Sequence, residues 1–275
     1  MIYQNELWFG THHIYKNMTG STNDDIKELV RDNPQGGYVV RAAKQINGKG
    51  RRGRQWVSED GGLYFSFDVS PVLMERAKKT VLTSVQAPMV TLLAAMSVCE
   101  AIRERTGLDA LIKWPNDIVV HGRKLCGILT EMVMKGSDID LIIVGIGINL
   151  MQEHFPTEIV DTATSLKKAM KDNLPTDSLE SDVLDCDMLV NRVIENMHYF
   201  YDLYFEDNKE VFIDCYNQRL AGIHGVVKVL DPKGEYTGVS LGVNESGELL
   251  VQKQNNEIVS VYAGEVSVRG IYGYI

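Results

Sequence analysis

The chain has 275 residues, of which 44% are hydrophobic and 24% are charged. Because a typical domain has about 150 residues, these values predict one large and one small folded domain and exclude a disordered chain. The 28 Lys and Arg against 37 Asp and Glu give a net charge of −9, which argues against a protein that coats nucleic acid through its overall field. Any bound anion must be held by a local group of cations.

Cysteine usage and the N-terminus indicate the compartment. Cys99, Cys126, Cys186 and Cys215 lie far apart without a C-x-x-C pair, which argues against a disulfide framework or a zinc cage. The first residues lack the basic and apolar regions of a signal peptide, and the longest apolar run, 141–151, is shorter than the roughly 20 residues that span a bilayer. We therefore expect a cytoplasmic protein that does not bind a membrane.

Helix and strand patterns alternate through the first 150 residues. Capping side chains at 21–25 predict a helix that begins near Asn23. Alternating or continuous apolar residues predict strands at 38–43, 63–69, 110–114, 117–120, 125–134 and 139–148. Apolar residues at helical spacing predict the main buried helix over 84–105, with Pro88 in its first turn and the sheet beside it. Short turns between the last four strands predict antiparallel neighbours.

The second half of the chain changes character twice. Residues 152–183 are mixed and polar, and helical patterns return over 184–205 and 208–220. From Gly222 onward, short β-rich segments with closely spaced glycines predict a small β-barrel. We place the domain boundary near Ala221, which gives domains of residues 1–221 and 222–275.

The segment Gly48–Trp56 concentrates positive charge. It reads G-K-G-R-R-G-R-Q-W. Glycines let backbone N–H groups approach a phosphate and guanidinium groups bind its oxygens in pairs, so the segment indicates a nucleotide phosphate site. A dinucleotide fingerprint would open a helix rather than lead into a strand, and no Lys-Ser or Lys-Thr pair completes a Walker A loop. The alternative is a solvated cationic turn, in which nothing would offset the repulsion between like charges.

Two further segments carry candidate ligand-binding residues. K-W-P-N-D at 113–117 precedes R-K-L-C-G-I-L at 123–129, where Lys124 could be held over a cleft and Gly127 would leave room for a ligand. An ordinary hairpin with surface charges is the alternative. The third segment, 144–150, is an apolar strand with two glycines that ends at Asn149, whose amide suits an adenine edge. A bulge at a strand end fits these residues equally well.

Together with Ser21-Thr22-Asn23, the order of these motifs resembles the biotin protein ligase family over almost the whole chain, including the C-terminal A-G-E-V at 263–266. The resemblance implies an α+β fold with a mixed, mainly antiparallel sheet and packed helices, as in class II synthetases and biotin ligases. It also implies a small C-terminal SH3-like β-barrel and a catalytic domain that binds biotin and ATP at residues 1–221.

The implied activity is that of an ATP-dependent, AMP-forming ligase. The family activates biotin with ATP and Mg²⁺ to biotinyl-5'-AMP, releases pyrophosphate, and transfers biotin to one lysine of a biotin carboxyl carrier protein domain. The usual acceptor belongs to acetyl-CoA carboxylase, with another biotin-dependent carboxylase as the alternative. Biotin and the ATP–Mg²⁺ complex are then substrates, and we expect neither a tightly bound prosthetic group nor a metal site made by the protein.

The resemblance also assigns roles to individual residues. Ser21, Thr22 and Gln45 match positions that hydrogen-bond the ureido ring of biotin. The full set that matches biotin contacts is Ser21, Thr22, Asn23, Gln45, Gly48, Lys124, Gly127, Ile128 and Leu129. The set that matches nucleotide contacts is Lys49, Arg51, Arg52, Arg54, Trp56, Asn116, Lys124 and Asn149. The residues expected to carry the chemistry are Lys49, Arg51, Asp117 and Lys124.

This assignment agrees with the chemistry of the reaction. A carboxylate that attacks the α-phosphate brings two anions together, so cations are needed and an enzyme nucleophile is not. Asp117 would orient or deprotonate the carrier amine. Lys49, where the family often has arginine, keeps the charge but loses one fork of donors, so we expect altered affinity rather than lost activity. The cationic loop formed by the segment Gly48–Trp56 is expected to be mobile over residues 47–55 when the site is empty. It should become ordered over the adenylate, which water would otherwise hydrolyse.

Other functions share parts of the pattern. A lipoate or octanoate ligase or transferase of the same superfamily would share the fold, although Gly48–Trp56 and Lys113–Asp117 favour biotin. A nucleic-acid-binding module would use the cationic loop and the barrel, against the acidic total charge. Some family members carry an N-terminal helix-turn-helix, but Ser21 lies too close to Met1 for one, so we predict a short form without specific DNA binding. A homodimer formed by sheet edges is a further option.

Overall fold

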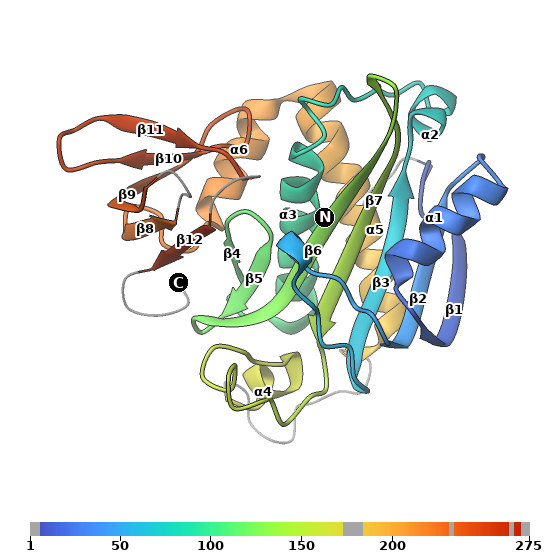
Figure 1. Cartoon of the computed structure of the whole chain (residues 1–275), viewed down its shortest axis with the longest axis horizontal. Helices are drawn as coiled ribbons and strands as arrows, with labels where there is room; N and C mark the ends of the chain where they lie inside the picture. Colours follow the sequence, from blue (N-terminus) through green and yellow to red (C-terminus); the bar gives the residue numbers. More distant parts are fainter. Residues whose placement is uncertain (1–5, 173–183, 231–233, 264–266, 271–275) are drawn as a thin grey trace.

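A seven-stranded sheet forms the large domain of the computed structural model, which describes residues 6–172, 184–230, 234–263 and 267–270 (Figure 1). The strand order is β1-β2-β3-β7-β6-β5-β4. The strands are β1 (His12–Thr19), β2 (Tyr38–Gln45), β3 (Gly62–Val69), β4 (Leu111–Lys113), β5 (Asp117–Val120), β6 (Arg123–Lys135) and β7 (Asp138–Asn149). Only the β1–β2 pair is parallel among the pairings of this sheet, which confirms the mixed, mainly antiparallel architecture.

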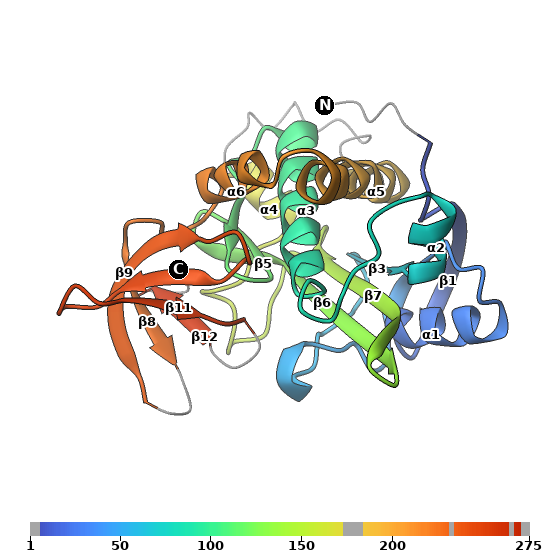
Figure 2. The same ribbon diagram turned by 90° about the horizontal axis from the view of Figure 1, so that it is seen from above.

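Helices cover both faces of this sheet. They are α1 (Thr22–Asp32), α2 (Pro71–Arg76), α3 (Met89–Thr106), α4 (Leu166–Lys171), α5 (Cys186–Asp202) and α6 (Lys209–Gln218). Figure 2 shows α3, α5 and α6 on one side of the sheet and α1 on the other. α3 is apolar on nearly all sides because it lies between the sheet and α5, and the main core forms around it. A smaller core forms under α1 from Ile26, Val40, Leu141 and Ile143.

α2 was not predicted, and three other differences between the predicted and the observed elements have physical reasons. α3 begins at Met89 rather than at Ser84, and Pro88 is its N-cap, because a proline disfavours helical geometry in the residue before it. β1 was not predicted, since as an edge strand it is mostly exposed and shows no apolar run. Within 152–172, the described part of the polar stretch, α4 forms behind an N-cap hydrogen bond from the Lys168 backbone to Ser165.

The C-terminal domain is a five-stranded antiparallel sheet in the order β11-β10-β9-β8-β12. Its strands are β8 (Val226–Leu230), β9 (Tyr236–Val243), β10 (Leu249–Gln252), β11 (Ile258–Val261) and β12 (Ser267–Gly270). This agrees with the expected small SH3-like barrel. The Trp114 indole donates to the Gly247 carbonyl at 3.0 Å, and the Asn217 amide exchanges two hydrogen bonds with the Val243 backbone. These contacts hold the small domain beside the end of the sheet that carries β4. None of the helices in the described ranges is long and apolar enough to cross a bilayer.

His198 of α5 is a buried titratable group in the main core. It is 0% exposed, its ring stacks on Phe9 at 3.7 Å between centroids, and its Nε2 lies 3.1 Å from the Phe9 carbonyl oxygen. Burial lowers the pKa of His198 to about 3, against the opposing effect of the Phe9 hydrogen bond and with a smaller contribution from the charge of Lys79. The imidazole is therefore neutral in the folded protein at ordinary pH.

The buried, neutral imidazole of His198 makes the free energy of unfolding depend on pH. Below about pH 6.5 the unfolded chain gains a proton at His198 that the folded chain does not, so the free energy of unfolding falls, approaching about 1.4 kcal/mol per pH unit. We expect His198→Gln to flatten the loss between pH 6.5 and 4.5 and the exposed His154→Gln to leave it unchanged, measured by urea unfolding. Identical slopes for wild type and His198→Gln would contradict this.

Candidate active site

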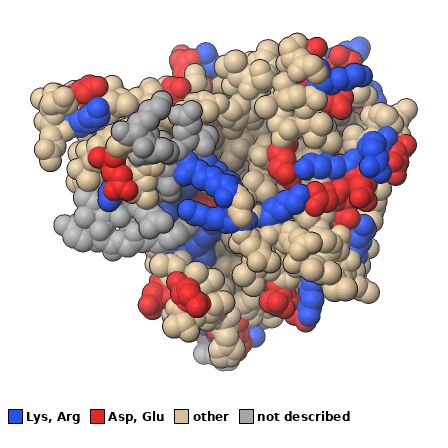
Figure 3. Space-filling view, in the orientation of Figure 1, with Lys and Arg blue, Asp and Glu red and all other residues tan. Residues whose placement is uncertain are grey.

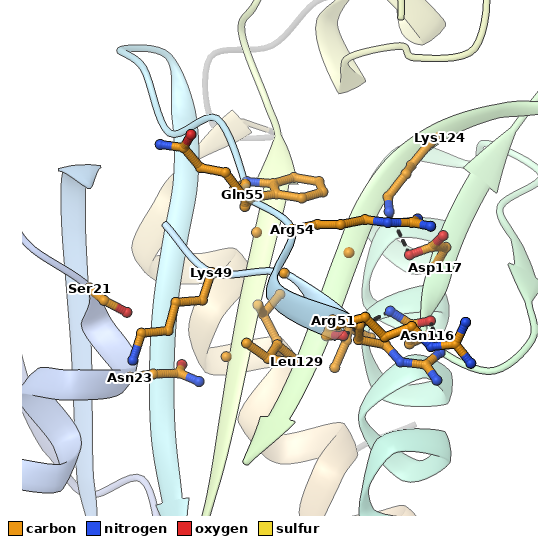
Figure 4. A pocket seen from close by; sticks show the side chains of 18 of the residues that line it. Ser21, Asn23, Lys49, Arg51, Arg54, Gln55, Asn116, Asp117, Lys124 and Leu129 are labelled. Atoms are coloured by element: carbon orange, nitrogen blue, oxygen red, sulfur yellow. Dashed lines mark hydrogen bonds and ion pairs between the residues drawn. The ribbon is translucent and has the colours of Figure 1, made fainter. Parts of the chain in front are cut away.

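A pocket opens on the α1 side of the sheet, over the centres of β6 and β7 (Figure 4). Its walls come from the start of α1, the end of β2, the loop 49–56, the segment 113–117 and the two central strands. Lys and Arg side chains gather across the middle of this face (Figure 3). The predicted site residues that line it are Ser21, Thr22, Asn23, Gln45, Lys49, Arg51, Arg52, Arg54, Trp56, Asn116, Asp117, Lys124, Gly127, Ile128 and Leu129. Segments that lie far apart in the sequence thus meet in one site.

Two predicted residues stand behind the pocket instead of lining it. Asn149 is buried, and its amide nitrogen donates to the Thr164 carbonyl at 3.1 Å. Gly48 lies under the cationic loop, where a side chain would collide with the Trp56 carbonyl and the Ser58 hydroxyl. Both residues support the walls, and neither belongs to the lining of this pocket.

Glycines form the floor of the pocket. Gly127 of β6 pairs directly with Gly147 of β7, and the Trp56 indole lies over both. A Cβ at Gly127 would lie 2.7 Å from the indole ring, and one at Gly147 would lie 2.5 Å from Trp56 Nε1. Close approach of the indole therefore requires glycine at both positions. Gly145, two residues earlier, leaves the space that Asn23 occupies.

Arg51 is held at one end of the pocket. Its Nη1 donates to Asn116 Oδ1 at 2.8 Å, and its Nη2 donates to the Ala263 carbonyl of the C-terminal domain. Asn116 in turn donates from Nδ2 to the Ile128 carbonyl at 3.0 Å. Burial, followed by the charge of Arg52, lowers the pKa of Arg51 from its ordinary value. The surroundings therefore disfavour the positive charge, and an incoming anion would relieve this.

Lys124 lies beside the Trp56 indole of the loop. Its Nζ is 2.7 Å from Asp117 Oδ1 and 5.2 Å from the centroid of the Trp56 ring (Figure 4). The Lys124 backbone is fixed on both sides by the polar stretch, since its N–H donates to Thr162 at 2.7 Å and its carbonyl accepts from Thr164 at 2.9 Å. Part of the segment 152–172 thus positions the lysine.

The opposite end of the pocket is polar, and the ammonium group of Lys49 lies there, paired with Asp24 (Figure 4). The Thr22 backbone N–H donates to Gln45 Oε1 at 2.9 Å, which turns Gln45 Nε2 toward Ser58 Oγ, also at 2.9 Å. Ser21 is the N-cap of α1 but makes no capping hydrogen bond through its side chain. Between the two ends the pocket is lined by the Leu129 side chain and the glycines of the floor, while the Ile128 side chain packs in the main core on the other face of the sheet. The pocket therefore suits a ligand with a polar head, an apolar middle and an anionic tail.

Gly50, Gln55, Lys113, Trp114, Pro115, Gly145, Ile146 and Gly147 also line the pocket; they lie in the three predicted segments but were given no individual role there. Glu131 and Ser66 lie outside those segments and were not predicted. Glu131 receives a hydrogen bond from Asn23 at 2.6 Å, and Ser66 donates one to Asn23 at 2.6 Å. The two-residue alternation of a strand that places Gly127 and Leu129 on one face also places Glu131 there, and this was the available signal. No group of three or more His, Cys, Asp or Glu suited to holding a metal occurs among the described residues.

Comparison with known proteins identifies the family. Residues 15–149 match the model of the biotin/lipoate A/B protein ligase family, and residues 226–269 match the biotin protein ligase C-terminal domain. The bifunctional ligase/repressor BirA of Bacillus subtilis is 32% identical over 262 residues, which are 94% of this chain and 74% of that protein. A biotin protein ligase from Aquifex aeolicus in complex with biotin and ATP has 30% identity and a TM-score of 0.77, covering 94% of this chain and 99% of that one.

The chain therefore belongs to the biotin/lipoate A/B protein ligase family. Within this family it groups with the biotin protein ligases, which confirms the resemblance seen in the motifs. The match to the biotin protein ligase C-terminal domain favours this group over the lipoate alternative.

The contact between Gly147 and Trp56 can be tested without any ligand. Gly147→Ala places a methyl group against the indole, so Trp56 must leave the floor and the loop that carries it must detach. We expect trypsin to cleave between Arg51 and Arg54 at least about tenfold faster than in wild type, measured by mass spectrometry of the fragments. Gly20→Ala, which adds a methyl group where nothing lies within 4 Å, is the control. Equal cleavage rates in all three proteins would contradict the packing.

Proposed function

We propose that the chain activates biotin with ATP to biotinyl-5'-AMP, releases pyrophosphate, and then transfers the biotinyl group to a lysine of a biotin carboxyl carrier protein domain. The observation that supports this most directly is the polarity of the pocket. Thr22 and Gln45 form a polar end suited to a ureido ring, Leu129 and the glycine floor an apolar middle suited to an alkyl chain, and Arg51 and Lys124 an end suited to a carboxylate beside a phosphate.

In the first step the biotin carboxylate attacks the α-phosphate of ATP. The carboxylate and the phosphate repel each other, and negative charge grows on the phosphoryl oxygens as the bond forms. Arg51, Lys49 and Lys124 supply the positive charge, and Mg²⁺ enters with ATP as part of the substrate. Lys49 pairs with Asp24 and Lys124 pairs with Asp117 in the free protein, so both exchange an internal carboxylate for the substrate anions.

The polar end of the pocket disfavours lipoate as the substrate. The dithiolane ring of lipoate offers neither an N–H donor nor a carbonyl acceptor, so it would leave the polar groups of Thr22 and Gln45 at this end of the pocket without a ligand hydrogen bond. Biotin offers both groups in its ureido ring. The difference supports biotin over an octanoyl or lipoyl group.

The second step requires a neutral amine on the carrier lysine. Asp117 is mostly buried, lies at the pocket and is paired with Lys124. Once Lys124 has turned to the adenylate, the Asp117 carboxylate can orient the incoming amine and accept its proton as the amide bond to biotin forms and AMP leaves. The acceptor is a carrier domain of acetyl-CoA carboxylase or of another biotin-dependent carboxylase, and the cytoplasm, where the four free cysteines stay reduced, is the site of action.

The two domains, with their boundary at 221/222, have different proposed roles. Residues 1–221 carry the pocket, and residues 222–275 support it through the Ala263 and Gly247 carbonyls, which accept from Arg51 and Trp114.

β1 is the edge of the large sheet and the place where a second copy would pair if the protein dimerises. Mobility of the cationic loop and the lack of operator binding stay predictions.

Biotin-dependent release of pyrophosphate from ATP tests the proposed function. Wild type should release pyrophosphate only when biotin is present, and lipoate should not replace it. Lys124→Ala should lower the turnover number about 100-fold, because one cation next to the reacting anions is lost. Lys135→Ala, which removes an exposed lysine from the same strand, is the matched control and should have no effect. Release that is independent of biotin, or equal with lipoate, would overturn the proposal.

The role of Asp117 separates the two steps. Asp117→Asn keeps an acceptor for Lys124 but removes the base, so adenylate formation should continue while transfer to a carrier domain slows about 100-fold. Single-turnover transfer from preformed biotinyl-5'-AMP measures the second step alone. A wild-type transfer rate in this variant would show that Asp117 serves only to hold Lys124.

A further inference from the structure

A row of buried polar side chains connects Glu131 to the ureido end of the pocket. Glu131 of β6 accepts from Lys27 Nζ at 2.9 Å through one oxygen and from Asn23 Nδ2 at 2.6 Å through the other. Asn23 Oδ1 accepts from the hydroxyl of Ser66, and the Ser66 hydroxyl lies 2.7 Å from that of Thr22. Asn23, Ser66 and Thr22 are at most 4% exposed, so water does not compete for these contacts.

The fold brings this row together at Gly145. Ser66 of β3 pairs with Gly145 of β7, and Glu131 lies one strand further on, in β6. Because Gly145 has no side chain, Asn23 at the start of α1 lies flat on the sheet between Ser66 and Glu131. Figure 4 shows Asn23 at this edge of the pocket.

The carboxylate of Glu131 fixes the direction of every hydrogen bond in the row. Burial alone would raise the pKa of Glu131, but the hydrogen bonds from Asn23 and Lys27 and the charge of Lys27 together hold it below its usual value. An ionised carboxylate only accepts, so the Asn23 amide must turn its nitrogen to Glu131 and its oxygen to Ser66. Ser66 then uses its single hydrogen on Asn23.

The consequence reaches the Thr22 hydroxyl. Ser66 can now only accept from Thr22, and the other neighbour of that hydroxyl, Gln45 Oε1 at 3.1 Å, is also an acceptor. The Thr22 hydrogen therefore points into the protein in either case. What Thr22 presents to the pocket is an oxygen lone pair, which accepts from an N–H group and repels a carbonyl.

We propose that Glu131 is a positioning residue, acting through Asn23 and Ser66, that makes Thr22 a hydrogen-bond acceptor and thereby selects the N–H edge of a cyclic urea. This rests on the proposed function, because it concerns how the same pocket recognises biotin. Glu131 lies outside the pocket lining and touches neither the ligand space nor the reacting groups. It acts on affinity for biotin and not on the chemical step.

An exchange of the two partners tests the polarity directly. Asn23→Asp sets two carboxylates against each other, so the KM for biotin should rise about 100-fold. Glu131→Gln leaves an amide that can turn either its oxygen or its nitrogen to Asn23, so the KM for biotin should rise about tenfold. In the double variant, Asn23→Asp with Glu131→Gln, the new amide at position 131 donates to one oxygen of the new carboxylate at position 23. The second oxygen of that carboxylate accepts from Ser66. The hydrogen bonds of the row then have their original direction, so the KM for biotin should fall to within about threefold of the wild-type value.

The readouts separate positioning from general damage to the fold. The rate at saturating biotin and the KM for ATP should change much less than the KM for biotin, and Glu28→Gln, an exposed carboxylate on the same helix, should change none of them. If Asn23→Asp does not fold, Ser66→Ala gives a second route. With the row interrupted, adding Glu131→Gln should alter the KM for biotin less than about twofold.

Two outcomes would overturn the inference: a double variant no better than Asn23→Asp, or a full tenfold effect of Glu131→Gln in the Ser66→Ala background. Each requires that wild type releases pyrophosphate with biotin. Loss of that activity in wild type would instead refute the proposed function, so the two failures are distinguishable.

Discussion

Concentrated positive charge beside a glycine floor is the constraint around which the site is organised. Arg51 is half-buried next to Arg52 and Arg54, and its pKa is lowered because neither partial burial nor these neighbours favour its charge. The other two cations of the predicted chemistry, Lys49 and Lys124, are each paired with one carboxylate. The free protein is thus arranged to accept two anions at once, and a reaction between a carboxylate and a phosphate needs this.

The rest of the fold holds these groups where they are needed. α3 and α5 fill one face of the sheet with the main core, which leaves the α1 face for the pocket. The chain segment after β7 fixes the Lys124 backbone, and the C-terminal domain receives hydrogen bonds from Arg51 and Trp114. The Lys124 backbone and the Arg51 guanidinium are therefore each held by a neighbouring part of the fold, and glycines form the floor between them.

Much of the fold followed from local patterns, and the exceptions have physical reasons. Strands β2 to β7 show clear alternation or buried runs, so their existence could be predicted, and the short turns between β4, β5, β6 and β7 predicted the antiparallel pairing of these four. β1 could not, because an edge strand with both faces largely exposed carries no hydrophobic period. The cationic loop, Lys124 and Gly127 were recognisable because charge and glycine are concentrated in sequence. Glu131 and Ser66 were not, because each is a single polar residue whose meaning depends on sheet register and on Asn23 reaching across Gly145.

The most direct measurement of the central claim is a crystal structure of the chain grown with biotin and ATP together. The account predicts a ureido ring against Thr22 and Gln45, and an anionic group between Arg51 and a Lys124 that has left Asp117. Clear density for both compounds elsewhere, with this pocket empty and Lys124 still paired to Asp117, would contradict it.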